Sequence, residues 1–178
     1  KIIDIQNGYS DAPEGIEVID LKEKTVLPGL MDMHVHIEGQ SNPKRYENRF
    51  RQNEADVALE ATVYAKKSLM AGFTVVRDLG GSGVNISLRN AINMGHVIGP
   101  RIYTVEKAIG TTGGHADPTN GVRKDLMEDP GPKEGVINGP EDAFKAVRQR
   151  YKNGADLIKI TATGGVLSVA KDGMGPQF

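Results

Sequence analysis

Apolar and polar positions alternate most clearly over residues 26–36, a short strand-like run that ends in two histidines. Because the side chains of a strand point to opposite faces in turn, Asp32, His34 and His36 share one face. The other face is apolar and is expected to pack on helices; it consists of Met31, Met33, Val35 and Ile37. Both imidazoles are therefore expected to project from the carboxyl end of the strand into the same space.

After this strand, helical and strand-like periods alternate along the chain. Glycine and proline mark several of the boundaries: Gly72 ends the first helical run, and Pro140 lies in the first turn of the last one. The predicted elements are a helix over 54–70, a strand over 73–77, a helix over 84–93, a strand over 101–105, a helix between Gly139 and Gly154, and a strand over 155–161.

An internal similarity supports this assignment, because residues 71–77 and 153–159 share a glycine stop followed by branched apolar residues and a basic residue. Repeated βα units imply parallel strands with right-handed crossovers. We predict an α/β fold that is the first half of a (β/α)8 TIM-like barrel, with the histidines at the end where barrel active sites lie. An open doubly wound sheet would alternate in the same way, but no G-x-G-x-x-G motif follows the first strand.

Residues 1–27 have a different character, since short β-type runs are broken by Asn7-Gly8 and by Pro13-Glu14-Gly15. We interpret them as part of a small β-sandwich that precedes a barrel domain over residues 28–178. The chain begins without Met and stops within what reads as a loop, so we expect it to be a segment of something longer. As half a barrel it would need the missing C-terminal half as a partner.

The composition bears on the kinds of partner and of metal ligand that the chain can have. The 178 residues are 38% hydrophobic and 25% charged with a net charge of −1, which is typical of a soluble globular protein and gives no indication of nucleic acid or membrane as a partner. Cysteine is absent, so a metal site would have to use histidine, carboxylate or modified lysine. The absence of cysteine is compatible with cytoplasm, periplasm or secretion.

The pair formed by His34 and His36 is the first candidate site. Two neutral imidazoles on one strand face suit a first-row transition metal, and zinc is the usual occupant. The alternative is a pair of surface or core histidines without a ligand role. The preceding Pro-Gly turn and the alternation favour the metal site.

Lys159 lies at the carboxyl end of the last predicted strand, on the same face as Leu157 and Thr161. It is open to two interpretations. An ordinary lysine there would form an ion pair or bind substrate. A lysine N-carboxylated by carbon dioxide would instead be an anionic carbamate that can bridge two divalent metals, whereas an ammonium would be disfavoured beside them.

His115 lies in a long loop, within Thr111–Pro118. Long loops in compact domains are usually functional or disordered, and the two glycines before His115 allow a close approach of the backbone. We interpret His115 as a catalytic residue that contacts substrate or an oxyanion. The alternative is a histidine with a structural role in the turn, where Asp117 could cap the segment before Pro118.

Four weaker candidates receive structural interpretations. Asp32 is expected to orient a histidine rather than to bind metal. Arg77 and Asp78 are expected to form a buried ion pair, and His96 is expected at the surface near a helix end.

These motifs resemble those of the amidohydrolase superfamily, and within it the metal-dependent dipeptidases of the Xaa-Pro dipeptidase and carboxypeptidase type. The resemblance covers essentially the whole chain and is carried by residues 27–36, 72–78, 111–121 and 154–160. The His-x-His strand is common to the superfamily. The glycine-histidine loop and the lysine strand are more specific to the subgroup.

The resemblance implies a (β/α)8 barrel beside a β-sandwich, with two zinc ions in its site. His34 and His36 would bind one zinc ion, and N-carboxylated Lys159 would bridge both. Two histidines from strands five and six and an aspartate from strand eight would complete the site, and none of them lies in these 178 residues. We also expect a homo-oligomer.

The implied activity is hydrolysis of amide or peptide bonds, in which metal-activated hydroxide releases a C-terminal amino acid from small peptides or N-acyl amino acids. His115 would assist at the carbonyl. One alternative is a cyclic amide hydrolase of the imidazolone type, against which Lys159 argues because such sites often lack the bridging lysine. The other is a non-catalytic barrel half that binds a partner polypeptide.

Overall fold

A three-stranded parallel sheet organises the chain in the computed structural model, which describes residues 5, 7–8, 11, 13–165, 168–169 and 173–178. The strands lie in the order β1 (Leu30–Val35), β2 (Phe73–Asp78) and β3 (Arg101–Thr104). Each strand is joined to the next by a segment that contains helix, as parallel pairing requires. The α/β class with parallel strands is therefore confirmed.

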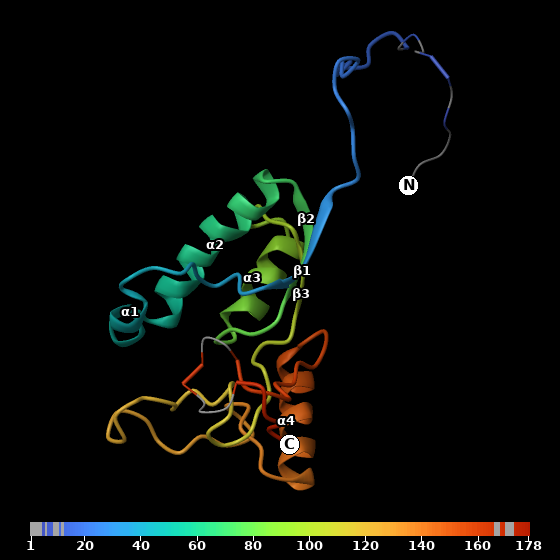
Figure 1. Ribbon diagram of the computed structural model, residues 1–178. Helices are drawn as coiled ribbons and strands as arrows, with labels where there is room; N and C mark the ends of the chain where they lie inside the picture. Colours follow the sequence, from blue (N-terminus) through green and yellow to red (C-terminus); the bar gives the residue numbers. More distant parts are fainter. Residues whose placement is uncertain (1–4, 6, 9–10, 12, 166–167, 170–172) are drawn as a thin grey trace.

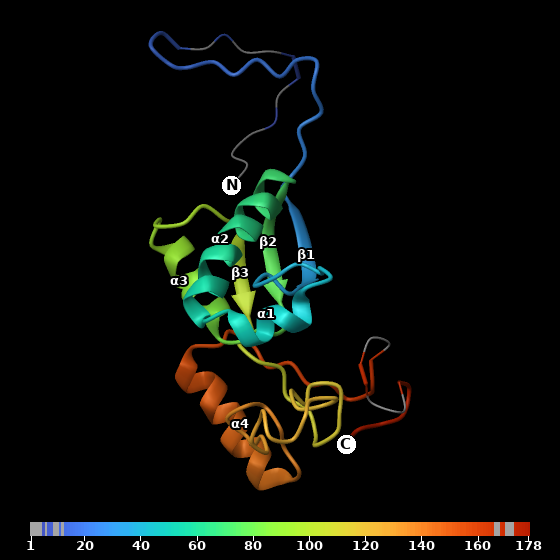
Figure 2. The same cartoon turned by 90° about the vertical axis from the view of Figure 1, so that its left-hand side faces the viewer.

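Two helices pack on one face of the sheet, and two lie near its carboxyl end (Figures 1 and 2). The packed helices are α2 (Glu54–Met70) and α3 (Val84–Asn93). The short α1 (Arg45–Arg51) follows β1, and α4 (Pro140–Asn153) lies beyond the ends of the strands, beside the long loop after β3. The opposite face of the sheet has no helix on it among the described residues.

The helices form where local signals are strong. Asn53 and Asp56 form a capping box that begins α2, and the backbone of Gly72 has φ +97° just after the helix ends. The predicted bounds of α2 and α3 agree with the structure, and α4 begins at Pro140 as expected. The sequence patterns missed α1, a seven-residue helix without buried residues.

The core lies between the sheet and α2 and α3. It is formed by buried Ile37, Ala61, Ala65, Val76, Leu88 and Ile102, with Val35 and Phe73 packed against it. Met31 and Met33, predicted to face helices, are 66% and 42% exposed. They lie on β1, the edge strand, where no described helix reaches them.

The strand predicted over 155–161 is only partly realised. The backbone N–H of Asp156 donates to Thr104 O at 2.8 Å, and Ile160 forms an isolated parallel bridge with Ile109. The segment therefore lies beside β3, but no regular ladder forms, so the described residues form a sheet of three strands where four were predicted for the barrel.

The sandwich strands predicted in residues 1–27 are not seen in the described part of that segment. Residues 13–27 carry no strand, and their apolar side chains, such as Ile16, Val18 and Ile19, are exposed. A strand needs a partner for its N–H and C=O groups, and no described strand lies beside this arm (Figure 1). The runs at 1–4 and at residues 6, 9–10 and 12 lie outside the described residues. No described helix combines the length and apolar character needed to cross a membrane.

Candidate metal centre

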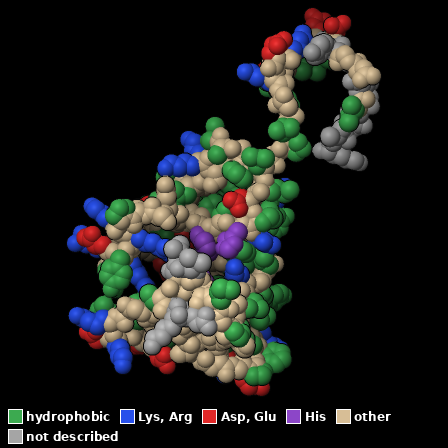
Figure 3. Space-filling view, in the orientation of Figure 1, with side chains coloured by type: hydrophobic (Ala, Val, Ile, Leu, Met, Phe, Trp, Pro, Cys, Tyr) green, Lys and Arg blue, Asp and Glu red, His purple; other side chains and the backbone are tan. Residues whose placement is uncertain are grey.

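His34 and His36 lie side by side at the carboxyl end of β1. Their ring centroids are 5.5 Å apart in an edge-on arrangement with an interplanar angle of 62°. Both side chains are exposed, and histidine side chains form one group on the surface in Figure 3. The alternation of the strand thus brings the two predicted imidazoles together.

The ring of His36 is held by the loop that follows β2. Its Nδ1 lies 2.7 Å from the carbonyl oxygen of Gly80. Because a carbonyl can only accept, Nδ1 must carry the proton, and Nε2 of the neutral ring keeps its lone pair. A backbone carbonyl on one ring nitrogen is the usual support for a histidine that binds metal through the other.

Asp32 supports His34 in a different way from the one predicted. Its Oδ1 accepts the backbone N–H of His34 at 2.9 Å, so it fixes the strand rather than the imidazole ring. The ring of His34 is left to be oriented by its neighbours on the open face of the sheet.

The surroundings of His34 favour its neutral form. Partial desolvation lowers the pKa of His34 below 6.5, and the positive charges of Lys159, His36 and Arg77 lower it further, while Asp32 raises it. A neutral imidazole is the form that binds a metal ion. The effect of Lys159 on the pKa of His34 shows that its charge lies within electrostatic reach of that imidazole.

Lys159 is positioned by the segment beside β3. Its carbonyl oxygen accepts the backbone N–H of Ile109 at 2.8 Å, and Ile109 in turn accepts from the N–H of Thr161 at 2.8 Å. Lys159 is half-buried on the irregular segment where a fourth strand was predicted.

His115 is exposed in the loop after β3. Its backbone N–H donates to Gln177 Oε1 at 3.0 Å, and its ring packs against Gly165 so closely that a Cβ there would collide with it. Among the described residues, no hydrogen bond or ring contact joins His115 to His34 or His36. Asp117 caps this turn as predicted, because its carboxylate accepts the N–H groups of Gly113 and Thr119 at 2.7 and 2.8 Å.

The predicted buried ion pair between Arg77 and Asp78 is wrong. Adjacent residues of a strand point to opposite faces, and Arg77 Nε donates instead to Met33 O at 2.7 Å. Asp78 is fully buried and accepts from Asn85 Nδ2 at 2.6 Å and Thr104 Oγ1 at 2.8 Å. Burial raises the pKa of Asp78 above 3.8, against the effect of its hydrogen bonds. His96 is exposed near the end of α3, as predicted.

Sequence reasoning missed the polar residues that support the carboxyl end of the sheet. Glu38, Glu106 and Arg150 each make several hydrogen bonds there, and Glu106 and Arg150 form a buried ion pair of 3.0 Å. The only signal of Glu38 was its place two residues after His36. Backbone acceptors such as Gly80 O carry no signal in a sequence pattern.

The donor set fits part of a zinc site. Two imidazoles are typical ligands of a catalytic zinc ion, which takes three protein ligands and keeps one open position. No cluster of three His, Cys, Asp or Glu side chains suited to a metal exists among the described residues. A third protein ligand would therefore have to be Lys159 in a modified form or a residue outside the described set.

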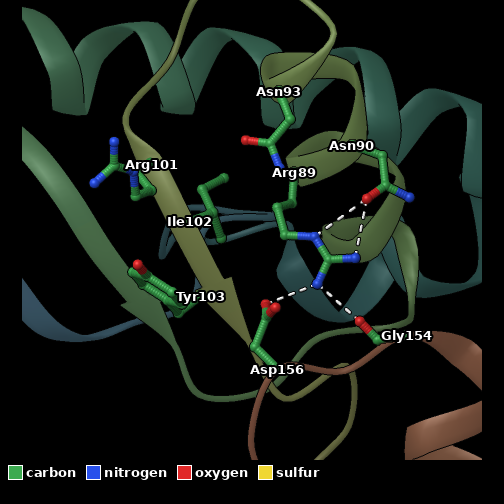
Figure 4. A pocket seen from close by; sticks show the side chains of 8 residues that line it. All are labelled: Arg89, Asn90, Asn93, Arg101, Ile102, Tyr103, Gly154 and Asp156. Carbon is green, nitrogen blue, oxygen red and sulfur yellow. Dashed lines mark hydrogen bonds and ion pairs between the residues drawn. The ribbon is translucent and has the colours of Figure 1, made fainter.

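One hollow of the described surface lies along α3 and β3 rather than at the histidines. It measures about 350 Å³ and is lined by residues of α3 and β3 and by Gly154 and Asp156, with no histidine (Figure 4). Arg89 reaches across it and donates from Nη1 to Asp156 Oδ2 and to Gly154 O, each at 2.7 Å. These bonds tie α3 to the segment after α4, which is a structural role.

The family model described as the amidohydrolase family matches residues 25–178. Among curated proteins, the chain is 30% identical over 155 residues to an ochratoxinase of Aspergillus niger; the match covers 80% of this chain and 32% of that protein. The chain thus spans about a third of the length of this relative.

Two solved structures are also similar. A Xaa-Pro dipeptidase with methionine bound in its active site has 53% sequence identity and a TM-score of 0.90, with 98% of this chain and 43% of that one covered. A prolidase in complex with N-methylphosphonate-L-proline has 35% identity and a TM-score of 0.80, covering 97% of this chain and 42% of that one.

Proposed function

The chain belongs to the amidohydrolase family, and from this premise we propose that it is part of a zinc-dependent hydrolase of amide or peptide bonds. The enzyme would release a C-terminal amino acid from dipeptides or N-acyl amino acids. The observation that carries the proposal is the pair His34 and His36, 5.5 Å apart with Lys159 in electrostatic reach. We further propose that residues 28–178 are the first half of a (β/α)8 barrel and that residues 1–27 belong to a β-sandwich beside it.

The roles of the metal ligands follow from their supports. His36 would bind zinc through Nε2, because its Nδ1 is engaged by Gly80 O. His34 would bind beside it in the neutral form that its lowered pKa favours. Lys159, N-carboxylated, would bridge two metals. When bound, zinc would lower the pKa of a water molecule towards neutrality and polarise the amide carbonyl.

His115 would act on the substrate rather than on the metal. Its loop is held by the cap of Asp117 and by the bond from its own N–H to Gln177. An exposed imidazole on a braced loop can donate a hydrogen bond to a carbonyl oxygen as negative charge develops there.

The substrate class is supported by the relatives. Two of the similar structures bear the names Xaa-Pro dipeptidase and prolidase, and one of them holds a phosphonate of proline. At 53% identity over nearly the whole chain, the Xaa-Pro dipeptidase is a strong guide. Dipeptides with a C-terminal proline are therefore the first substrates to test, followed by other dipeptides and N-acyl amino acids.

The test uses the full-length protein with a panel of dipeptides and N-acyl amino acids. We expect hydrolysis that is lost after chelation and restored by added zinc. His34→Ala and His36→Ala should each lose one metal and most activity while circular dichroism stays unchanged, because both side chains lie at an exposed strand end. Hydrolysis that persists without metal, or full zinc occupancy in either variant, contradicts the proposal.

A further inference from the structure

The loop that holds His36 is itself held by a carboxylate. Glu38 Oε2 accepts the backbone N–H of Ser82 at 2.7 Å, and Glu38 Oε1 accepts the N–H of Asn85 at 2.8 Å. These N–H groups lie at the start of α3, where the first turn of a helix has no intrahelical acceptors. The N-cap residue Gly83 has no side chain to supply one.

The same loop is anchored on its other side by the main chain. Gly81 N–H donates to Glu106 O at 2.7 Å. A Cβ at Gly81 would collide with the carboxylate of Glu38 and lie 2.8 Å from Asn85 Nδ2, so the loop and Glu38 are in close contact. Gly80, whose carbonyl engages His36, immediately precedes this clamped segment.

Three contacts therefore connect the segment that follows β1 with the end of β2 and the loop after it. β1 ends at Val35, His36 follows, and Glu38 is two residues further on. Glu38 holds the loop after β2, and that loop presents Gly80 O to His36 Nδ1. Asp78 closes the same corner, because its Oδ1 accepts the N–H of Ile37 at 3.1 Å.

We propose that Glu38 is a positioning residue for the metal site: it clamps the loop after β2 so that the Gly80 carbonyl holds His36 with Nε2 free for zinc. This inference rests on the proposed function. In this role Glu38 acts on the loop and not on substrate or metal: each of its oxygens accepts a backbone N–H group of the loop or of the start of α3. Its effect passes through the loop to the tautomer and the orientation of one imidazole.

A merely structural role for Glu38 would be that of a helix cap. The chain offers a matched control for this, because Asp56 also places a carboxylate at a helix start: its Oδ2 accepts the N–H of Asn53 at 2.8 Å. Asp56 lies in the first turn of α2, and no described hydrogen bond joins it to the loop that holds His36. Loss of either carboxylate weakens a helix N-terminus, but only loss of Glu38 should disturb the imidazole.

The experiment measures the zinc dissociation constant of the full-length protein by competition with a chromophoric chelator. Glu38→Ala should weaken zinc binding about tenfold, the lower end of the effect of removing an outer support. Glu38→Gln keeps one acceptor and should lie between Glu38→Ala and the wild type. Gly81→Ala should resemble Glu38→Ala, because the new methyl group displaces the carboxylate. Asp56→Ala should bind zinc as the wild type does.

A second measurement reports directly on the ring. In the metal-free protein above pH 8, nitrogen NMR of labelled histidine should find the Nδ1–H tautomer of His36 in the wild type and in Asp56→Ala. Glu38→Ala should give a mixture of tautomers. Wild-type zinc affinity and an unchanged tautomer in Glu38→Ala would overturn the inference, as would equal losses in Glu38→Ala and Asp56→Ala. A wild-type protein that binds no zinc would overturn the proposed function as well. If His36→Ala loses zinc but Glu38→Ala binds it as the wild type does, the proposed function stands and only the role of Glu38 is overturned.

Discussion

At the scale of single residues, the two histidines of the candidate site are supported unequally. His36 has its ring fixed by Gly80 O, whereas Asp32 fixes only the backbone of His34. The pKa of His34 is lowered first by partial desolvation and then by the charges around it. The candidate site therefore combines one imidazole whose ring is held by a hydrogen bond with one whose neutral form is favoured by its surroundings.

Substitution of Lys159 distinguishes its proposed role as a metal-bridging carbamate from that of an ordinary ion-pairing lysine. In the full-length protein, Lys159→Ala should lose the bridging ligand and the activity, and a short carboxylic acid in the buffer should restore part of both. Lys159→Arg should also fail although it keeps the charge, because a guanidinium does not form the carbamate. Zinc stoichiometry and peptide hydrolysis, with and without bicarbonate, check this; two metals and normal turnover in Lys159→Arg would return Lys159 to the ordinary role.

Asp117 should make the loop of His115 sensitive to acid. Burial acts to raise the pKa of Asp117, but hydrogen bonds from Thr119 and Gly113 outweigh it and hold the pKa below 3.8. The stabilisation is thus fully present above about pH 4 and is lost as the pH falls through the folded-state pKa.

Asp117→Asn removes this effect. It should lower the free energy of unfolding by about 1 kcal/mol at pH 7, and the gap to the wild type should narrow below the ordinary aspartate pKa of 3.8. Urea unfolding at several pH values measures it. A gap that widens in acid would show that the carboxylate of Asp117 is not the stabilising group.

Sequence patterns predicted that the two histidines of the candidate site lie together, but not which groups hold them. His34 and His36 could be predicted because strand alternation is a property of sequence spacing. The pairing of Arg77 with Asp78 was predicted wrongly, because neighbours in sequence lie on opposite faces of β2. The contacts of Gly80 O with His36 and of Glu38 with Ser82 could not be predicted, because each joins residues 44 positions apart in the sequence that only the fold brings together.

At the scale of elements, α4 is joined to the end of β3 by a buried ion pair. Arg150 is fully buried; its Nη1 donates to Glu106 Oε2 at 3.0 Å, and its Nη2 donates to the carbonyl oxygens of Pro132 and Lys133. Asn153 Nδ2 donates to the other oxygen of Glu106 at 2.6 Å. The turn at Glu106, with φ +65°, is held by these contacts.

Arg150→Ala should therefore be strongly destabilising. Removing one partner of a buried pair leaves the other charge uncompensated, which costs about 3–5 kcal/mol. Arg148→Ala, an exposed arginine on the same helix, is the control and should change little. Urea unfolding of the full-length variants measures both. Equal stabilities for the two would mean that the Glu106–Arg150 pair does not secure α4.

Elements with local signals were predictable, and elements that need a distant partner were not. The bounds of α2 and α3 follow from periodicity and glycine stops. The strand over 155–161 has the right composition, but its ladder depends on continuous pairing, and only Ile160 forms a bridge. The missed α1 has seven residues and buries none of them, and its apolar signal is limited to the pair Tyr46 and Phe50.

At the scale of the whole molecule, the sheet exposes unpartnered surface. β1 and β3 each pair with β2 alone in the described sheet, and the face that carries the histidines has no covering helix. Tyr103 on this face is 46% exposed. Unpaired strand edges and exposed apolar residues both promote association.

Residues 1–178 expressed alone should therefore self-associate and lack hydrolytic activity. Light scattering after size-exclusion chromatography should find oligomers or aggregates rather than a single species. The full-length protein is the control for activity. A monodisperse, zinc-loaded and active monomer of residues 1–178 would contradict this prediction.

The most direct test of the account is to locate zinc in a crystal of the full-length protein by anomalous diffraction at the zinc edge. We predict a peak within about 2.0–2.1 Å of Nε2 of both His34 and His36, with His36 Nδ1 still on Gly80 O and a second peak joined to the first through the modified side chain of Lys159. A zinc-soaked crystal with no peak at the two histidines, or with His36 bound through Nδ1, would contradict the account.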